Sequence, residues 1–179
     1  MKKKKFFRFL LKDDKKIGVL YAPKEVDTSF GEEVLPVIGN EKMSFTLKGG
    51  AYAPFLNSDV RAIFANEELK NLIEEIIPEN YPLEFLPVKT VSEEHGDNLY
   101  YIIHFKEIFQ VIDKKNSVCI PGTDSIVKPY IDHNKAKDLD FFNSNVTINE
   151  IIVSDKMKKL MKKRKLDAGI EFKEVPYVE

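Results

Sequence analysis

Two stretches of the chain repeat apolar residues with the spacing of a helix that buries one face. The first begins after Asn66, a good N-cap residue, and ends before Pro78, which a helix interior cannot accommodate. Its apolar stripe occupies positions i, i+3, i+4 and i+7, with Leu69, Leu72, Ile73 and Ile76. The pattern predicts an amphipathic helix between residues 66 and 78.

The second helical stretch lies near the C-terminus. Ser154 is its expected N-cap, and the apolar stripe consists of Met157, Leu160 and Met161. Gly169 is expected to end the helix as a left-handed cap, because glycine adopts positive φ at little cost.

Extended segments flank both predicted helices. Asp59–Ala65 precedes the first and Leu83–Val88 follows it, while Ile151–Val153 and Ile170–Val175 flank the second. The two helical stripes match with a shift of 88 residues, and the strands that follow them match with a shift of 87. The pattern predicts two similar strand–helix–strand units. Two ordinary amphipathic helices would give the same match by coincidence.

Further strands are expected in the rest of the chain. Phe6–Leu11 and Ile17–Tyr21 are predicted to form a hairpin, with Lys12–Lys16 as the turn. Leu99–Phe105 is rich in aromatic and β-branched residues, which favour strands. Residues 24–56 are expected to be irregular, with short strands at most. Other short strands are predicted at Val34–Ile38, Met43–Leu47, Ser117–Ile120, Ile126–Ile131, Asp140–Asn143 and Val146–Ile148.

The predicted fold class is α+β: a mostly antiparallel sheet with two main amphipathic helices in two similar strand–helix–strand units. The length of 179 residues fits a single domain, residues 1–179. A subdomain boundary near residue 56 would separate a β-rich part, residues 1–56, from an α+β part, residues 57–179.

The composition and the lone cysteine bear on where the protein works. Hydrophobic residues make up 43% of the chain and charged residues 32%, as in globular proteins. Cys119 has no partner for a disulfide within the chain, which favours a reducing compartment. The apolar stretch Phe6–Leu11 is short for a signal peptide and Arg8 interrupts it. No run is apolar over the roughly 20 residues of a membrane span. We expect a cytoplasmic protein without membrane contact.

Charge is unevenly distributed along the chain, although the net charge is only −1. Residues 1–16 carry eight basic and two acidic side chains, and residues 155–165 carry seven basic and one acidic. Residues 24–98 carry six basic and fifteen acidic side chains. Segregated charge on the surface would steer a partner toward one face of the protein. The same charge pattern is also expected if the basic and acidic segments lie together in the fold and neutralise one another.

Lys156–Lys165 (KMKKLMKKRK) is the most basic stretch. It is either a solvated helix face opposite the apolar stripe or a surface for an acidic partner. An RNA-binding accessory protein using this stretch is an alternative, and it requires an exposed basic strip continuous with Lys2–Lys5 and Arg8. Because the overall charge has no basic excess, we expect nucleic acid not to be the partner.

Catalytic signatures are missing from the sequence, which has no phosphate-binding loop, dinucleotide glycine pattern, HExxH helix or GxSxG elbow. A metal-dependent hydrolase or nuclease could assemble from His104, Asp113 and His133 in three dimensions, but a half-buried histidine with one hydrogen bond explains His104 equally simply. Cys119 is expected to be a small buried hydrophobe rather than a nucleophile. We therefore expect no enzymatic activity, no cofactor and no metal.

The second part of the chain resembles a family of bacterial immunity proteins of polymorphic toxin systems, formerly a domain of unknown function. The likeness covers residues 57–179 and consists of the following segments in order: Phe64–Leu72, Leu83–Val88, Tyr100–His104, Val111–Ser117, Ile152–Lys158 and Gly169–Phe172.

The resemblance implies a non-enzymatic protein that binds and neutralises a cognate bacterial toxin by protein–protein contact. It brings no catalytic residues with it. We expect one charged helix face to meet a complementary toxin surface. The candidate contacts are either acidic, Glu67, Glu68, Glu74 and Glu75, or basic, Lys158, Lys159, Lys162 and Lys163.

Overall fold

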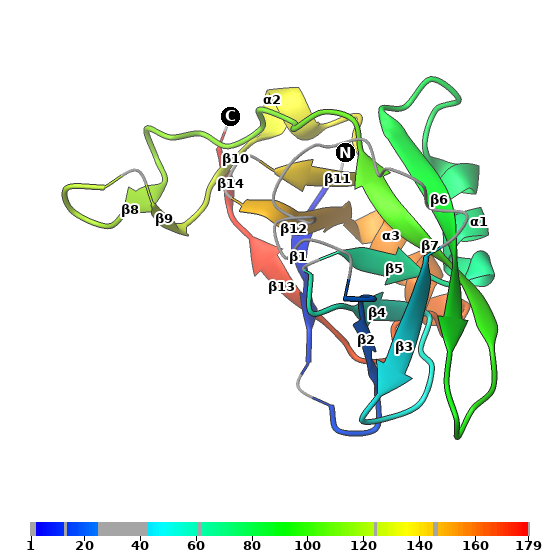
Figure 1. Ribbon diagram of the computed structural model, residues 1–179. Coiled ribbons are helices and arrows are strands. Elements are labelled where there is room, and N and C mark those ends of the chain that lie inside the picture. The colour runs from blue at the N-terminus through cyan, green and yellow to red at the C-terminus, as the bar shows by residue number, and fades with distance from the viewer. Residues whose placement is uncertain are drawn as a thin grey trace.

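The computed structural model describes residues 3–12, 14–24, 43–60, 62–123, 125–144 and 147–178. Most of the strands form two sheets (Figure 1). The four-stranded sheet is antiparallel throughout and has the order β11 (Phe141–Ser144), β12 (Thr147–Ser154), β1 (Phe6–Leu11) and β13 (Ile170–Val175). The six-stranded sheet has the order β2 (Val19–Tyr21), β3 (Ser44–Lys48), β6 (Leu83–Val91), β7 (Asn98–Phe105), β5 (Ile63–Ala65) and β4 (Phe55–Asn57).

Smaller elements complete the described part of the chain. Two-stranded sheets are formed by β8 (Val118–Cys119) with β9 (Ile126–Lys128), and by β10 (Ile131–Asp132) with β14 (Tyr177–Val178). The helices are α1 (Glu67–Ile76), α2 (His133–Ala136) and α3 (Asp155–Lys163). Pairing between these strands is antiparallel except between β3 and β6 and between β10 and β14. The described residues therefore form an α+β structure with mostly antiparallel sheets. None of their helices is long and apolar enough to span a bilayer.

Each long helix connects two strands that lie on either side of a third. β5 and β6 precede and follow α1, and both pair antiparallel with β7. β12 and β13 precede and follow α3, and both pair antiparallel with β1. The N-caps are as predicted from the sequence: Asn66 accepts a hydrogen bond from the backbone N–H of Leu69, and Ser154 accepts one from Met157.

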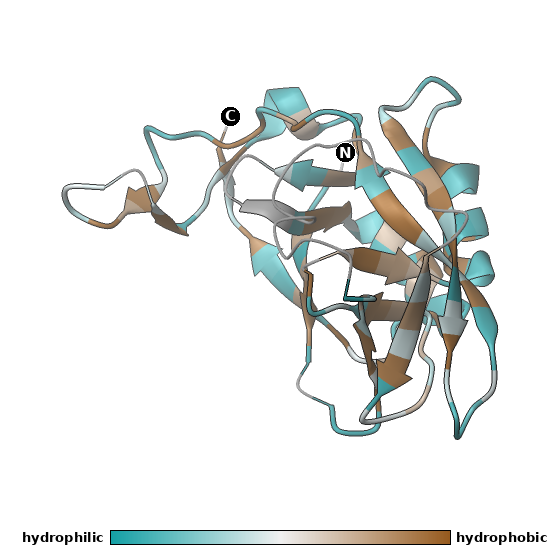
Figure 2. Ribbon diagram, in the orientation of Figure 1, coloured by the Kyte–Doolittle hydropathy of each residue, from teal (hydrophilic) through white to brown (hydrophobic). Residues whose placement is uncertain are grey.

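The main core lies where α1 and α3 pack against the two sheets. Leu69, Leu72 and Ile73 of α1 and Met157 and Met161 of α3 are fully buried there. The β1 strand is buried on both faces, because Phe7 and Phe9 point into this core and Phe6 points into a second one. Figure 2 shows the resulting pattern, with hydrophobic residues along β5 and β7 and polar residues on the outer surface of α1.

The predicted hairpin of Phe6–Leu11 with Ile17–Tyr21 is wrong. β2 pairs with β3 instead, and β1 lies between β12 and β13. The physical reason is the near-continuous apolar run of β1, which needs a central position with both faces covered. A two-stranded hairpin at an edge would leave one face of that run in water.

Three other expectations change in the structure. Gly169 does not cap α3: the helix ends at Lys163, and Lys165 takes the left-handed position with φ 59°. The separate strands predicted at Val146–Ile148 and Ile151–Val153 are replaced by the single strand β12. Cys119 is exposed rather than buried. The predicted strand at Val34–Ile38 lies outside the described residues.

Candidate functional site

The candidate site is a pocket where the segment before β1 meets the first turns of α3. We call it the basic pocket. Its volume is about 540 Å³, and it is lined by Lys3, Lys4, Lys5, Phe7, Asp140, Asp155, Lys156, Lys158 and Lys159. Six lysines face two aspartates, so the lining carries four more positive than negative charges. Such an excess in one hollow favours an anionic ligand or an acidic surface.

Chain topology explains why lysines so distant in the sequence meet here. The β1–β12 register places Phe6 opposite Ser154, the N-cap of α3. The backbone N–H of Asp155 also donates to the carbonyl of Lys5 at 2.9 Å. The two basic segments of the sequence are therefore joined at the point where β1 begins and α3 begins.

Asp140 organises the floor of the pocket. Its carboxylate accepts a hydrogen bond from the Ser154 hydroxyl at 2.5 Å, and the Lys4 and Lys156 ammonium groups lie 2.9 and 3.4 Å from its oxygens. Burial alone would raise the pKa of this carboxyl group. The hydrogen bonds from Ser154 and Lys4 outweigh burial and hold the pKa below its usual value. Asp140 is thus a fixed negative charge that ties the N-terminal segment to the cap of α3.

Lys158 lies over an aromatic ring. Its ammonium nitrogen is 3.5 Å from the ring centre of Phe7 and 5.5 Å from that of Phe172. Burial lowers the pKa of Lys158, and the nearby positive charge of Lys162 lowers it further. A cation over a ring face is attracted by the ring quadrupole, so Lys158 holds a defined position in the wall.

The remaining lysines of the pocket are only partly neutralised by neighbours. Lys5 pairs with Glu174 at 2.8 Å, and this hydrogen bond and the charge of Glu174 raise the pKa of Lys5. Lys159 pairs with Asp155 at 3.3 Å across one turn of α3. Both lysines keep part of their ammonium surface in water, and exposed ion pairs of this kind are weak. They remain available to a partner.

The acidic and basic candidates of the sequence lie on neighbouring helices. Glu67, Glu68, Glu74 and Glu75 are all exposed on α1. Arg164, just after α3, donates to Glu75 at 2.7 Å, and α1 and α3 are in contact (Figure 1). The surface of this helix pair is therefore acidic on α1 and basic on α3.

The structure separates the four basic candidates into two groups. Lys158 and Lys159 line the basic pocket, whereas Lys162 and Lys163 are exposed in the last turn of α3 and do not line it. From the sequence, Lys3–Lys5 were named only as part of the basic strip of the RNA-binding alternative, and Asp140 was not proposed as a site residue. The high positive charge of the first 16 residues is the sequence feature that points to these lysines. No motif or charge cluster near Asp140 in the sequence identifies it as a pocket residue.

Arg8 does not join the pocket. It forms an ion pair with Glu150 of β12, a buried residue whose side chain is 3% exposed. Burial raises the pKa of Glu150, and the charge of Arg8 opposes this. The basic strip required by the RNA-binding alternative therefore includes Lys3–Lys5 but not Arg8. Lys2 lies outside the described residues.

The residues of the hydrolase alternative occupy different local environments. His104 contacts Glu84 through Nδ1 at 2.7 Å, and Asp113 accepts hydrogen bonds from the Asn116 side chain and two backbone N–H groups. His133 packs against the rings of Phe6 and Tyr177. The described residues contain no group of three or more His, Cys, Asp or Glu side chains that could hold a metal ion. The convergence that this hypothesis needs is not found among them.

Comparison with known proteins adds no family. A scan against protein-family models finds no match, and a search of curated proteins finds no significant relative.

Proposed function

We propose that this protein is a cytoplasmic immunity protein that binds a cognate bacterial toxin and neutralises it by contact, without catalysis. The observation that carries the proposal is the basic pocket, where six lysines outnumber two aspartates. Its lysines would meet acidic side chains of the toxin, and the long-range attraction would speed capture. The acidic face of α1, a helix that contacts α3, would fix the orientation of the complex, because a partner must match both signs.

Details of the pocket favour a protein partner over a nucleic acid. Bases stack on free aromatic faces in most single-stranded nucleic-acid sites. Phe7 is the aromatic residue that lines the pocket, and Lys158 covers its ring. The two aspartates would also repel phosphates, whereas they can accept hydrogen bonds from a protein.

Charge reversal tests the proposal against each candidate toxin whose gene lies beside the gene of this protein. Lys159→Glu with Lys163→Glu should weaken binding on the order of tenfold and reduce its dependence on salt. Both side chains are exposed, so the fold should survive. Glu67→Lys with Glu68→Lys examines the acidic face in the same way, and Lys135→Glu, an exposed lysine on α2, is the control.

The outcomes separate the parts of the proposal. A wild-type protein that neither binds the neighbouring toxin nor rescues growth of cells producing it would contradict the immunity function. Binding that is indifferent to both charge reversals would contradict the electrostatic mechanism alone.

RNA binding is a second candidate. Lys3–Lys5 lie beside the lysines of α3, which supports it, but Arg8, which that hypothesis also includes, pairs with Glu150. A mobility-shift assay with single-stranded RNA at low salt examines it. If the wild type shifts the RNA and the double variant Lys159→Glu with Lys163→Glu does not, the result would favour RNA over a toxin as the partner. No shift at low salt would remove this candidate.

We also propose that the two strand–helix–strand units are copies of one module. Two features support this: each helix connects strands that flank an antiparallel third strand, and the capping hydrogen bond is the same. Residues 63–91 should superpose on residues 151–175 with the same crossover hand in a crystal structure of the protein. Opposite hands would contradict a common module.

A further inference from the structure

A hairpin projects from the molecule, away from both large sheets (Figure 1). It consists of β8, β9 and the segments around them, residues 113–130 without Asp124, and we call it the arm. β8 and β9 pair only with each other among the described strands. The arm joins the rest of the molecule at its base, where Ile112 pairs with Ile131 and both side chains are buried.

Apolar side chains gather on the arm although it is exposed to water. Val118, Ile120 and Val127 are 51%, 47% and 61% exposed, and they are three of the seven large hydrophobic residues exposed in the described part of the chain. Figure 2 shows hydrophobic colour on β8 and β9. Exposed apolar residues grouped in one place mark interaction sites more often than scattered ones do.

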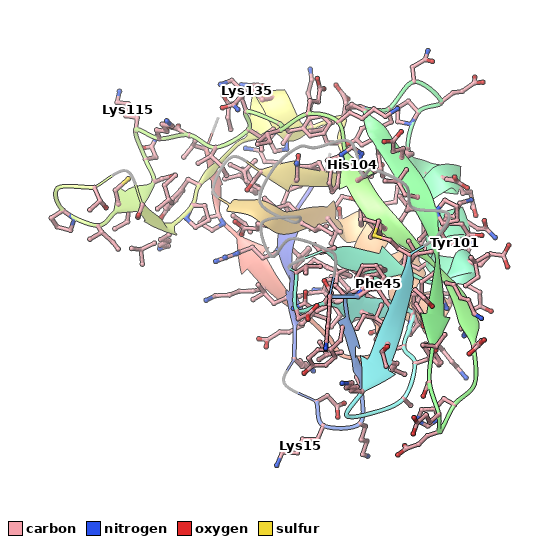
Figure 3. The ribbon with its side chains drawn as sticks, viewed as in Figure 1. Lys15, Phe45, Tyr101, His104, Lys115 and Lys135 are labelled. Atoms are coloured by element: carbon pink, nitrogen blue, oxygen red, sulfur yellow. The ribbon has the colours of Figure 1, made fainter. Side chains whose placement is uncertain are left out.

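The described part of the arm carries three lysines and one acidic residue, Asp113, whose carboxylate holds the base of the arm by hydrogen bonds. Lys114, Lys115 and Lys128 are exposed on the arm, and none of them forms an ion pair with a described residue. Figure 3 shows Lys115 pointing away from the rest of the molecule. A partner that meets the arm should therefore carry acidic side chains beside an apolar segment.

The base of the arm is held firmly by hydrogen bonds. The carboxylate of Asp113 accepts from the backbone N–H groups of Lys115 and Asn116 and from the Asn116 amide at 2.7 Å. Ser117 donates to the carbonyl of Asp113 at 2.6 Å and accepts from the backbone N–H of Tyr130 at 2.9 Å. A base ordered before binding reduces the entropy lost when a complex forms.

The far end of the arm is a defined turn. The backbone N–H of Ile120 donates to the carbonyl of Ser125, and that of Thr123 donates back to the carbonyl of Ile120. Gly122 supplies the positive φ of 79° that this turn needs. The two strands are thereby fixed side by side, with the outer edge of β9 unpaired by any described strand.

We propose that the arm binds an extended apolar segment of a partner protein, flanked by acidic residues, as a strand added along the free edge of β9. An unpaired edge offers backbone N–H and C=O groups that only another polypeptide strand can satisfy in register. Val127 and neighbouring apolar side chains would contact the added strand, and Lys128 and Lys115 would contact its acidic flanks. The proposal needs neither the basic pocket nor a toxin.

Three other occupants fit the arm less well. A lipid surface or a nucleic acid would favour free aromatic rings at the contact, and the ring of Tyr130 is half-buried with Lys128 above it at 5.3 Å. A second copy of the chain that paired arm to arm would bring like charges together.

Binding of two labelled synthetic peptides to the full chain tests the proposal by fluorescence anisotropy. Both peptides alternate valine and isoleucine with threonine, one between glutamate flanks and the other between lysine flanks. The glutamate-flanked peptide should bind at least tenfold more tightly than the lysine-flanked one. Val118→Ser with Val127→Ser should weaken its binding at least tenfold. Val19→Ser, which changes an exposed valine of β2, is the matched control and should not alter binding.

Several results would overturn the proposal. Equal binding of both peptides, no binding of either, or binding that survives Val118→Ser with Val127→Ser would each do so. So would arm-dependent binding to vesicles of phosphatidylserine and phosphatidylcholine without peptide binding. A dimer in sedimentation that the same arm variant dissociates, again without peptide binding, would assign the arm to a second copy instead. An unchanged melting temperature of the arm variant verifies that its fold is intact.

Discussion

Replacing Asp140 with asparagine should destabilise the protein at neutral pH but not in acid. The substitution Asp140→Asn keeps the shape of the side chain and an oxygen that can accept from Ser154, but it removes the negative charge. The Ser154 bond then has a neutral acceptor, which weakens it by about 1 kcal/mol. The substitution also removes the ion pair with Lys4, whose ammonium nitrogen lies 2.9 Å from the carboxylate and in which both side chains are mostly buried. This loss lowers the free energy of unfolding by about another 1 kcal/mol.

The expected loss of about 2 kcal/mol corresponds to a melting temperature lower by about 4–8 °C for a chain of this size. Its pH dependence follows from the lowered pKa of Asp140. The folded protein holds this carboxylate ionised below the usual value of 3.8, so its stabilisation is present above that pH. The stabilisation disappears as the pH falls through the folded pKa. The difference between wild type and Asp140→Asn should therefore shrink below about pH 4.

The difference in free energy of unfolding between wild type and Asp140→Asn is measured by urea unfolding, followed by circular dichroism. The measurement starts at pH 7 and is repeated stepwise down to the lowest pH at which the wild type folds. Asp138→Asn is the matched control, because Asp138 is an exposed aspartate two residues away. It should change the free energy of unfolding by less than about 0.5 kcal/mol. The role given to this charge would be refuted if Asp140→Asn lowered the free energy of unfolding by the same amount at every pH. It would also be refuted if Asp138→Asn lowered it as much as Asp140→Asn does.

Three further substitutions address the helices and the cores. Lys165→Gly should stabilise the protein by about 1 kcal/mol in urea unfolding, because Lys165 has a left-handed backbone that glycine adopts without strain; a loss of stability would contradict this. Leu72→Ala should cost about 2–5 kcal/mol in the same assay, since Leu72 is fully buried, and a change below about 1 kcal/mol would show that its core is not close-packed. Tyr100→Phe should cost about 1–2 kcal/mol, because the buried hydroxyl group donates to the carbonyl of Ala53 at 2.7 Å, and thermal melting should report it.

Local features of the fold could be predicted from the sequence, and long-range ones could not. The predicted N-caps Asn66 and Ser154 are confirmed, because capping depends on the residues of one turn. The partners of β1 could not be predicted, because strand pairing depends on which surfaces remain to be covered.

The end of α3 shows packing overriding a local preference. Glycine is the usual left-handed cap, which made Gly169 the expected residue, but Lys165 takes that position. The backbone N–H of Lys165 donates to the carbonyl of Lys162 at 3.1 Å, and that of Leu166 donates to the carbonyl of Met161 at 2.9 Å. Leu166 is buried in the same core as Met161, so packing fixes where the helix ends.

The candidate site was predictable in part. The charge of the two basic segments and the periodicity of α3 identified Lys158 and Lys159, because a helix face can be predicted from spacing. Joining them to Lys3–Lys5 required the β1–β12 pairing, which no local pattern shows. The exposure of Cys119 was unpredictable for a related reason: an apolar strand is expected to be covered, and the arm leaves its strands in water.

The position of β1 has a consequence for how the chain folds during synthesis. Phe6 pairs with Ser154 on one side and with Val175 on the other, so β1 is synthesised well before both of its neighbours in the sheet. The ribosome makes on the order of 5–20 residues per second. The phenylalanines of β1 are therefore without their partner strands for several seconds or more during synthesis. Chaperones that recognise apolar segments can bind β1 during that interval. Contacts so distant in sequence also slow the final folding step.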